Sequence, residues 1–257
     1  MVPRGAADHA LASCPMTITV IIPVLNEARC IGQTLAHTAR LGFDELVIVD
    51  GGSVDTTCAI VESFAGLDPF ATEHISPQSA TRVRLLTAPP GRARQLNAGA
   101  AASRCDVLLF LHADTQLPAN ARQTVSTALS DQARIGGRFN VRFDSPCLMA
   151  QVIATLMNLR SRLSGIATGD QAIFVRRDVF ERIGRFADIP LMEDIEFTGR
   201  LHRAGPVVPL SETVVTAFRR WEHNGPLRTI LLMWTLRFLY WIGISPHRLQ
   251  HFYGMVR

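Results

Sequence analysis

The feature that most constrains the fold is the alternation of apolar strands and helical segments over about the first 130 residues. Four apolar runs are each followed by a segment of helical character: ITVIIPV (18–24), ELVIVD (45–50), RVRLLTA (82–88) and DVLLFLHAD (106–114). The continuous β-branched run of the first segment, ITVIIPV, is typical of a strand buried on both faces. The regular alternation of the four runs with helices predicts an α/β fold with a parallel central sheet that helices cover on both sides.

The second half of the chain has a mixed pattern. Alternating residues predict an antiparallel strand over GGRFNVRF (136–143), followed by a helix over 147–164 and a strand over AIFVRR (172–177). A helix that begins in MEDIEFTGRL and ends at Gly205, and a strand over TVVTAF (213–218), complete this half. A parallel half followed directly by a mixed half predicts one continuous domain.

Composition and charge exclude several classes of protein. The formal net charge is +4, and all 26 basic residues are Arg, scattered without a basic run or an RNA-binding motif, so we expect no nucleic-acid partner. The five cysteines are odd in number and form no CxxC pair, which argues against a zinc site and for reduced thiols in a cytoplasmic protein. Residues 1–15 lack the apolar core of a signal peptide, and we expect them to be a disordered leader.

One apolar segment, TILLMWTLRFLYWIGI (229–244), lies near the end of the sequence. It is shorter than the roughly 20 apolar residues of a membrane-spanning helix, and Arg237 lies in its middle. A buried helix is the favoured interpretation, and an interfacial helix is the alternative. The same segment could contact a membrane surface or form a homodimer interface.

Polar residues follow three of the predicted strands where each strand ends. Pro23 and Glu27 lie at the end of the first strand, Asp50, Gly52 and Ser53 follow the second, and His112 and Asp114 end the fourth. Ligands of open α/β sheets bind outside the carboxyl ends of the strands. We therefore expect these groups to converge in one crevice.

The loop after the second strand favours a ligand with negative charge. Gly51 and Gly52 allow close approach of the backbone, and Ser53 can cap the next helix. The loop has neither the GxGxxG spacing of a dinucleotide site nor a P-loop. A nucleotide could bind here, although not in the dinucleotide manner. The alternative role of a strand-end aspartate such as Asp50 is to cap the following helix.

His112 and Asp114 lie two residues apart, which on an extended strand directs both side chains to the same side. A carboxylate at a strand end can hold a divalent cation that clamps a diphosphate, and oxygen ligation suggests Mg²⁺ or Mn²⁺, with the imidazole favouring Mn²⁺. The alternative is that Asp114 caps the helix that begins near Pro118. The sequence leaves both open.

Two further clusters could take part in the chemistry. Glu193 and Asp194 are adjacent, so on a helix they point in different directions, and one could orient while the other acts as a general base. The alternative is a solvated pair at a helix N-terminus. Arg219, Arg220 and Trp221 could stabilise a diphosphate and stack on a ring.

In order and spacing, these motifs resemble glycosyltransferase family 2, whose members have the GT-A fold and use nucleotide-diphosphate sugars. The segments that carry the resemblance are VIIPVLNE, VDGGSVDTT, GRARQLNAGA, LHADT, GDQAIFVRRDVFERIGRF with MEDIEFTGRL, and RRW. The closer likeness is to a small bacterial subgroup of non-processive enzymes. The resemblance implies a Rossmann-like, mostly parallel sheet with a mixed C-terminal half.

The resemblance also implies a role for each site residue. Pro23, Glu27 and Asp50, with the loop of Gly52 and Ser53, would border the nucleotide, and Arg94 would lie near it. Asp114 would ligate Mn²⁺ or Mg²⁺, with His112 in place of the first Asp of the DxD motif. Asp194 would be the base, with Glu193 beside it. The residues implied to face the diphosphate and the acceptor are Asp170, Gln171, Arg219, Arg220 and Trp221.

The implied activity is inverting transfer of one sugar from a metal-bound nucleotide-diphosphate sugar to a hydroxyl of a lipid or small-molecule acceptor. On this interpretation, residues 16–130 form a nucleotide-binding half, residues 131–226 an acceptor-side half, and residues 227–257 an apolar helix and tail. We expect a cytoplasmic protein that could contact the inner face of the plasma membrane.

Two alternatives to this activity stay open. A sugar nucleotidyltransferase would normally carry a Gly-rich loop directly after the first strand, where this chain has PVLNEA. A non-catalytic peripheral membrane or scaffold protein would use the 229–244 helix and would not need the polar residues of the crevice.

Overall fold

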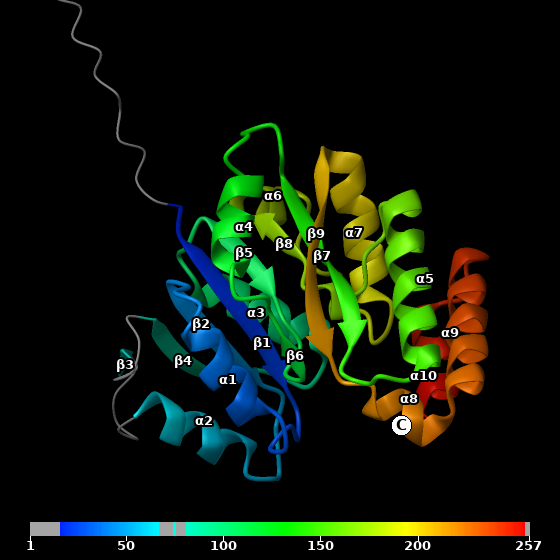
Figure 1. The fold of residues 1–257 in the computed structure, drawn as a ribbon, viewed down its shortest axis with the longest axis horizontal. Helices are drawn as coiled ribbons and strands as arrows, with labels where there is room; N and C mark the ends of the chain where they lie inside the picture. Colours follow the sequence, from blue (N-terminus) through cyan, green and yellow to red (C-terminus); the bar gives the residue numbers. More distant parts are fainter. Residues whose placement is uncertain (1–15, 67–73, 76–80, 255–257) are drawn as a thin grey trace, which may run out of the picture.

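The computed structural model describes residues 16–66, 74–75 and 81–254, whose strands form a nine-stranded sheet in the order β3-β4-β2-β1-β5-β8-β7-β9-β6 (Figure 1). The strands are β1 (Ile18–Val24), β2 (Glu45–Asp50), β3 (His74–Ile75), β4 (Arg82–Thr87), β5 (Val107–Phe110), β6 (Thr115–Gln116), β7 (Gly136–Phe143), β8 (Phe174–Arg176) and β9 (Val207–Thr216). The helices are α1 (Ile31–Ala39), α2 (Thr57–Ala65), α3 (Arg92–Ala102), α4 (Ala121–Ala128), α5 (Leu148–Ser164), η1 (Gly169–Gln171), α6 (Arg177–Arg182), α7 (Glu193–Ala204), α8 (Arg219–Asn224), α9 (Pro226–Trp241) and α10 (Pro246–Gly254).

The parallel part of the sheet confirms the prediction from the first half of the sequence. β1 pairs in parallel with β2 and β5, and β2 pairs in parallel with β4. Val24, the last residue of β1, lies opposite Asp50, the last residue of β2. The carboxyl ends of these strands therefore meet at one edge of the sheet, where the sequence predicts the crevice.

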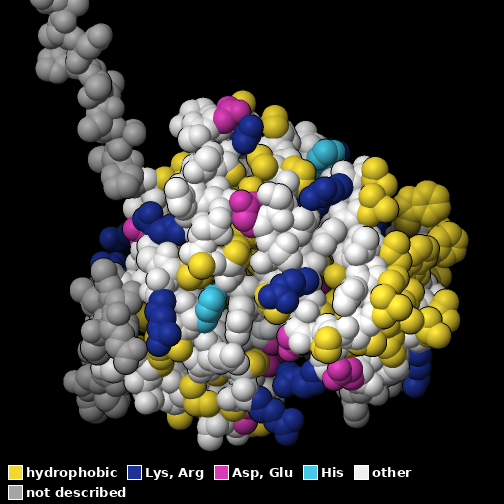
Figure 2. Space-filling view, viewed as in Figure 1, with side chains coloured by type: hydrophobic (Ala, Val, Ile, Leu, Met, Phe, Trp, Pro, Cys, Tyr) yellow, Lys and Arg dark blue, Asp and Glu magenta, His cyan; other side chains and the backbone are white. Residues whose placement is uncertain are grey.

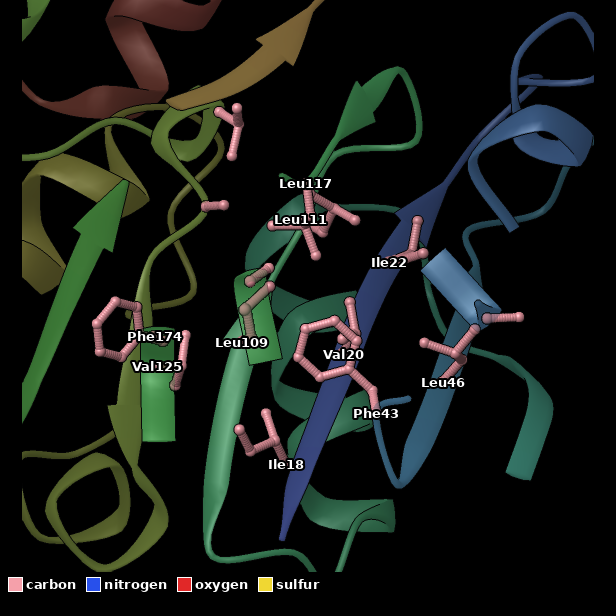
Figure 3. Packing of buried hydrophobic residues seen from close by; sticks show 14 of the residues in the cluster. Ile18, Val20, Ile22, Phe43, Leu46, Leu109, Leu111, Leu117, Val125 and Phe174 are labelled. Atoms are coloured by element: carbon pink, nitrogen blue, oxygen red, sulfur yellow. The ribbon is translucent and has the colours of Figure 1, made fainter. Parts of the chain in front are cut away.

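The apolar runs of the central strands supply two cores, one on each face of the sheet. Val20 and Ile22 contribute to a core with α1 and α4, part of which Figure 3 shows. Ile21 points the other way, into a second core with α3 and α7. Successive side chains of a strand point to opposite faces, so a strand covered on both sides must be apolar at every position.

The second half continues the same sheet with mixed pairing. β8 is antiparallel to both β5 and β7, whereas β7 and β9 are parallel with an irregularity between Arg138 and Asn140. The predicted strand over 136–143 is confirmed, and it has an antiparallel neighbour on one side and a parallel neighbour on the other. The pairing of β5 with β8 joins the two halves.

The fourth predicted strand is shorter than expected. β5 ends at Phe110, and the N–H of Thr115 donates to the carbonyl of His112 at 3.2 Å, which closes a turn over Ala113 and Asp114. The expectation that His112 and Asp114 lie on one extended strand is therefore wrong, because the chain turns here to enter β6.

The prediction that the apolar segment 229–244 is a buried helix is also wrong. Within α9 only Thr229 and Leu236 are buried, whereas Trp234 is 70% exposed and Trp241 is 80% exposed. The helix is apolar all round, but the start of α7 and α10 cover only one side of it. Among the residues that the structure describes, no helix is both long enough and apolar enough to cross a membrane.

Candidate functional site

The loops after β1 and β2 are linked by hydrogen bonds at the edge where the strands end. The N–H of Asn26 donates to Ser53 Oγ at 2.9 Å, and the N–H of Val54 donates to Asn26 Oδ1 at 2.9 Å. The N–H of Glu27 donates to Thr57 Oγ1 at 2.8 Å, at the first residue of α2. Asn26 has φ 57°, a left-handed conformation that asparagine tolerates well. The two loops therefore form one rigid rim.

Asp50 holds the loop that follows β2 through hydrogen bonds to its backbone. Its side chain is buried and accepts the N–H of Gly52 at 2.9 Å and that of Ser53 at 3.1 Å. Burial acts to raise the pKa of Asp50, but hydrogen bonds from Ser53 and Gly52 outweigh it and lower the pKa. Gly52 has φ +97°, which disfavours any other residue. Asp50 thus holds the loop in its turn, and it does not cap α2, which begins at Thr57 with Thr56 at the N-cap.

Pro23 and Glu27 lie on the other side of the same rim. Pro23 is half-buried in β1 beside Val49, and Glu27 is half-buried at the end of the first loop. Glu27 Oε2 accepts a hydrogen bond from Cys30 Sγ at 3.1 Å. Burial, followed by the contact with Glu27, raises the pKa of the Cys30 thiol to about 12. The thiol therefore stays protonated as a donor that orients Glu27.

Gln95 on α3 is a site-forming residue that the sequence analysis missed. Its buried amide donates two hydrogen bonds of 2.8 Å, to the carbonyls of Val24 and Val49. A Cβ added to Gly51 would lie 2.9 Å from Gln95 Nε2, which explains the glycine there. The amide fastens the ends of β1 and β2 together. The sequence feature that could have indicated this role is a single glutamine among the small and apolar residues of a helix that faces the sheet.

A second group of residues gathers at the end of β5. His112 Nδ1 lies 3.1 Å from Asp170 Oδ1, and the N–H of Gly169 donates to Asp194 Oδ2 at 2.8 Å. A Cβ on Gly169 would lie 2.3 Å from His112 Nε2, so the imidazole packs directly on this glycine. The short helix η1 therefore connects the strand end to the first turn of α7. These residues are distant in sequence, and the structure brings them together.

The side chain of Gln171 stabilises the short helix η1 from inside the protein. Its side chain is fully buried, and its Oε1 accepts the N–H of Thr168 at 3.2 Å. Its Nε2 lies 3.5 Å from Asn158 Oδ1 on α5. Gln171 lies inside the protein, whereas the neighbouring Asp170 is partly exposed beside His112.

Glu193 and Asp194 begin α7 but have different surroundings. Asp194 is half-buried and also accepts the N–H of Ile195 at 2.7 Å. Glu193 is 4% exposed and lies 3.4 Å from Arg92 Nη1. Burial raises the pKa of Glu193, and the attraction of Arg92 only partly opposes it. The alternative of a solvated pair is therefore wrong, because Glu193 faces the protein interior.

A small cavity lies beside this pair. It is lined by residues of α3, the end of β5, η1 and α7: Arg92, Leu96, Phe110, Leu111, His112, Gly169, Ile173, Phe186, Glu193 and Asp194. The lining places one cation, one imidazole and two carboxylates on an otherwise apolar wall. Arg92 belongs to this site, and the sequence analysis missed it.

Arg94 points elsewhere. Its Nε lies 2.8 Å and 3.0 Å from the two carboxylate oxygens of Asp188, and both side chains are exposed. The hydrogen bond to Asp188 raises the pKa of Arg94. Arg92, two residues earlier in the chain, is the arginine of α3 that reaches the Glu193 carboxylate.

Arg160 on α5 is a second cation that the sequence analysis missed. Burial lowers its pKa, and the charges of Asp194 and Asp170 oppose that change. Its Nε and Nη2 are buried and have no hydrogen-bond partner among the described residues. Arg160 thus places positive charge behind the two carboxylates that face the site.

The Arg-Arg-Trp triplet forms the start of α8. Arg219 is exposed, and the position of the Arg220 side chain lies outside the described part of the structure. Trp221 is half-buried and stacks parallel to Phe218, with ring centroids 6.3 Å apart. It also contacts Phe143 edge-on at 5.8 Å. The indole therefore belongs to the packing between β7 and α8, and Arg219 is its exposed neighbour.

Asp114 is the carboxylate best placed to bind a cation. It is half-buried and accepts one long hydrogen bond, 3.5 Å from Thr115 Oγ1. It does not cap α4, which begins at Ala121 with Asn120 at the N-cap. Among the described residues, no group of three or more His, Cys, Asp or Glu side chains could enclose a metal ion. A cation held by Asp114 would therefore need to take most of its ligands from outside the protein.

Comparison with known sequences shows which family the chain resembles. The family model for Glycosyl transferase family 2 matches residues 19–184. The chain is 27% identical over 227 residues to "Probable glycosyltransferase YdaM" of Bacillus subtilis (strain 168), covering 80% of this chain and 50% of the relative. It is 32% identical over 111 residues to "Glucosyl-3-phosphoglycerate synthase" of Mycolicibacterium paratuberculosis, covering 42% of this chain and 31% of that protein. The chain thus spans half or less of these curated relatives.

Solved structures have the same fold at low sequence identity. S. aureus TarS 1-349 in complex with UDP-GlcNAc superimposes with a TM-score of 0.60 and 17% identity, over 79% of this chain and 58% of that one. The mannosyltransferase PcManGT from Pyrobaculum calidifontis, in complex with GDP-Man and Mn2+, gives a TM-score of 0.59 and 22% identity, over 80% of this chain and 58% of that one.

Proposed function

This chain belongs to glycosyltransferase family 2 and has the GT-A fold, and we propose that it moves one sugar from a nucleotide-diphosphate sugar to an acceptor hydroxyl. The observation that carries the proposal is the convergence at one sheet edge. The rim of Asp50 and Ser53, the half-buried carboxylate of Asp114, and Asp194 at the start of α7 all lie there. These are the groups needed to hold a nucleotide, to hold a cation and to accept a proton.

The donor side is supplied by the linked loops and by Asp114. Backbone groups of the loops, together with Pro23 and Glu27, border the nucleotide. Asp114 would hold a divalent cation, which supplies positive charge against the diphosphate of the donor. That PcManGT was solved with GDP-Man and Mn2+ supports such a cation for this chain. His112, held between Asp170 and Gly169, has a positioning role beside it.

The acceptor side is supplied by α7. The oxygen of the acceptor hydroxyl attacks the anomeric carbon as the bond from that carbon to the diphosphate oxygen breaks, and Asp194 takes the hydroxyl proton. N–H groups of Gly169 and Ile195 hold the two oxygens of Asp194 at the first turn of α7. Attack from the side opposite the leaving diphosphate inverts the anomeric configuration. Arg219 and Arg160 place further positive charge near the departing diphosphate and the carboxylates.

Thermal unfolding tests the donor site. The melting temperature of the purified protein is measured with UDP, GDP, ADP and CMP, each with and without Mn²⁺, because the bases differ between the two liganded neighbours. A ligand at about 100 times its Kd adds roughly 2.7 kcal/mol to the free energy of unfolding. We expect a metal-dependent shift with one nucleotide, which Asp114→Ala abolishes.

The matched control is Asp178→Ala, which removes an exposed carboxylate of α6 that pairs with Arg182. This variant should keep the full shift. The proposal fails if no nucleotide raises the melting temperature, or if Asp114→Ala responds like the control.

A further inference from the structure

Helix α5 presents an apolar stripe to solvent. Five exposed residues recur at intervals of three or four along it: Leu148, Val152, Leu156, Leu159 and Leu163. This spacing places them on one side of the helix. The opposite side, which includes Ala150 and Ile153, packs into a core with Phe143 and Phe218. The helix therefore has one apolar side in the protein and a second one in water.

Helix α9 repeats this pattern beside α5. Its exposed residues, again three or four apart, are Leu227, Leu231, Trp234, Phe238 and Trp241. Ile230 of α9 packs against the same core as α5, so the two helices are neighbours. Figure 2 shows the resulting concentration of hydrophobic side chains at one end of the molecule, over α5 and α9. We call these ten exposed residues the α5–α9 face.

The two segments that form the α5–α9 face carry charge of one sign, and the exposed Asp144 and Glu222 directly precede them. Residues 145–169, which include α5, contain no Asp or Glu, and neither do residues 223–257, which include α9 and α10. The arginines of these segments include the exposed Arg162, Arg228 and Arg248. An apolar surface with tryptophans, on segments that contain arginines and no carboxylates, complements the negative headgroups and apolar interior of an anionic bilayer.

The α5–α9 face is connected to the proposed catalytic residues. The covered side of α9 packs, through Leu236, against Met192 and Ile195, which flank Glu193 and Asp194. The core beneath α5 includes Phe218 and Trp221, next to Arg219. When the α5–α9 face contacts another surface, this packing therefore fixes the position of the first turn of α7 relative to that surface.

We propose that the α5–α9 face binds an anionic phospholipid bilayer and holds the acceptor side of the crevice against it. The bilayer contact rests on the exposed residues and the charge alone. A second part, that the acceptor hydroxyl belongs to a lipid-borne molecule, rests on the proposed function. Self-association through the same face is disfavoured, because the segments that form it carry arginines and no carboxylates that could pair with them across a two-fold interface.

Vesicle flotation with the full chain tests the contact. The protein is mixed with vesicles of phosphatidylcholine alone or of phosphatidylcholine with one-third phosphatidylglycerol. We expect binding to the anionic vesicles, weakened by salt because the charge contribution is screened. Trp234→Ser with Trp241→Ser should weaken binding about tenfold or more. Arg162→Gln with Arg248→Gln should weaken it by about fivefold for each arginine.

Matched controls lie in the other half of the chain. Val54→Ser removes a side chain that is 90% exposed outside the α5–α9 face, and Arg82→Gln with Arg104→Gln removes two exposed arginines. Both controls should bind vesicles like the original protein. Absence of flotation with anionic vesicles, or equal binding by all variants, overturns the proposal. A dimer seen by light scattering that Trp234→Ser with Trp241→Ser makes monomeric, with no vesicle binding, also overturns it.

The nucleotide-induced shift in melting temperature distinguishes failure of this proposal from failure of the proposed function. The tryptophan double variant should lose vesicle binding but keep the metal-dependent shift, since the exposed indoles are outside the donor rim. Vesicle binding without any nucleotide shift would support the bilayer contact while the proposed function fails. A shift in melting temperature with a nucleotide, but no vesicle binding, would support the proposed function while the bilayer contact fails.

Discussion

At the scale of single residues, Asp194 is the side chain on which the proposed chemistry depends most. Its two oxygens accept N–H groups of Gly169 and Ile195, so the carboxylate is oriented but still half-exposed to a substrate. Asp194→Asn keeps the shape and removes the basic oxygen. We expect kcat for sugar transfer to fall by about 10²- to 10⁴-fold, the usual contribution of a general base. The nucleotide-induced shift in melting temperature should remain.

The control for this prediction is Asp178→Asn, a substitution of the same kind at an exposed ion pair. It should leave kcat unchanged. A residual rate above one-tenth in Asp194→Asn would show that another group takes the proton.

Glu193 should make the stability of the protein depend on pH. Because burial raises its pKa, the folded protein keeps this proton at pH values where the unfolded chain has lost it. The free energy of unfolding therefore falls as pH rises above the ordinary range of a glutamate. Glu193→Gln cannot ionise, so its melting temperature should fall less than that of the original protein between about pH 4 and pH 8.

Glu62→Gln, at an exposed position of α2, should follow the pH profile of the original protein. Parallel profiles for Glu193→Gln and the original protein would mean that the ion pair with Arg92 outweighs burial, and that Glu193 is ionised in the folded state.

At the scale of elements, the close packing of α3 on the sheet is a feature that one methyl group can test. A Cβ on Gly99 would lie 2.5 Å from Ile21 Cγ2 and 3.1 Å from Val49 Cγ2. Gly99→Ala should therefore lower the free energy of unfolding by about 1–3 kcal/mol through overpacking, less the helix-propensity gain of about 1 kcal/mol. Urea unfolding measures the difference.

Gly199 in α7 is the matched position, since its added Cβ would come no closer than 3.6 Å, to Ile166. Gly199→Ala should raise the free energy of unfolding by about 0.5–1 kcal/mol, because alanine is the better helix former. Equal effects of the two substitutions would contradict the close approach of α3 to β1.

The elements also show where sequence patterns are sufficient and where they are not. β1, β2 and β5 were predictable because each carries an unbroken apolar run, such as Val47 to Val49 in β2. The exposure of α9 was not predictable, since an apolar helix has the same sequence whether it is covered or not. The early end of β5 was also missed, because LLFLHAD continues the apolar pattern past Phe110 into a turn.

At the scale of the whole molecule, we expect the two halves of the chain to unfold together, because their strands belong to one sheet. β5 of the first half pairs with β8 of the second, so separation of the halves would expose strand edges of both. We expect the single domain predicted for residues 16–257 to unfold in one transition. The three tryptophans, Trp221, Trp234 and Trp241, all lie in the second half, whereas far-UV circular dichroism reports on both halves.

The two signals should therefore have the same urea midpoint. A tryptophan signal that changes at lower urea than the circular dichroism would show that α8 and α9 unfold separately from the sheet, and would contradict a single cooperative unit.

The sequence by itself determined the parallel half of the sheet and the edge at which the polar residues gather. Those features depend on local patterns, namely buried runs and the residues that directly follow them, such as Asp50. It also determined the family, through the order of its motifs. Tertiary structure alone decided the partners. Arg92 with Glu193, His112 with Asp170 and Gln95 with two strand ends are 101, 58 and 46 to 71 residues apart in the chain. Such pairs depend on distances set by packing across the whole sheet, and no local pattern encodes them.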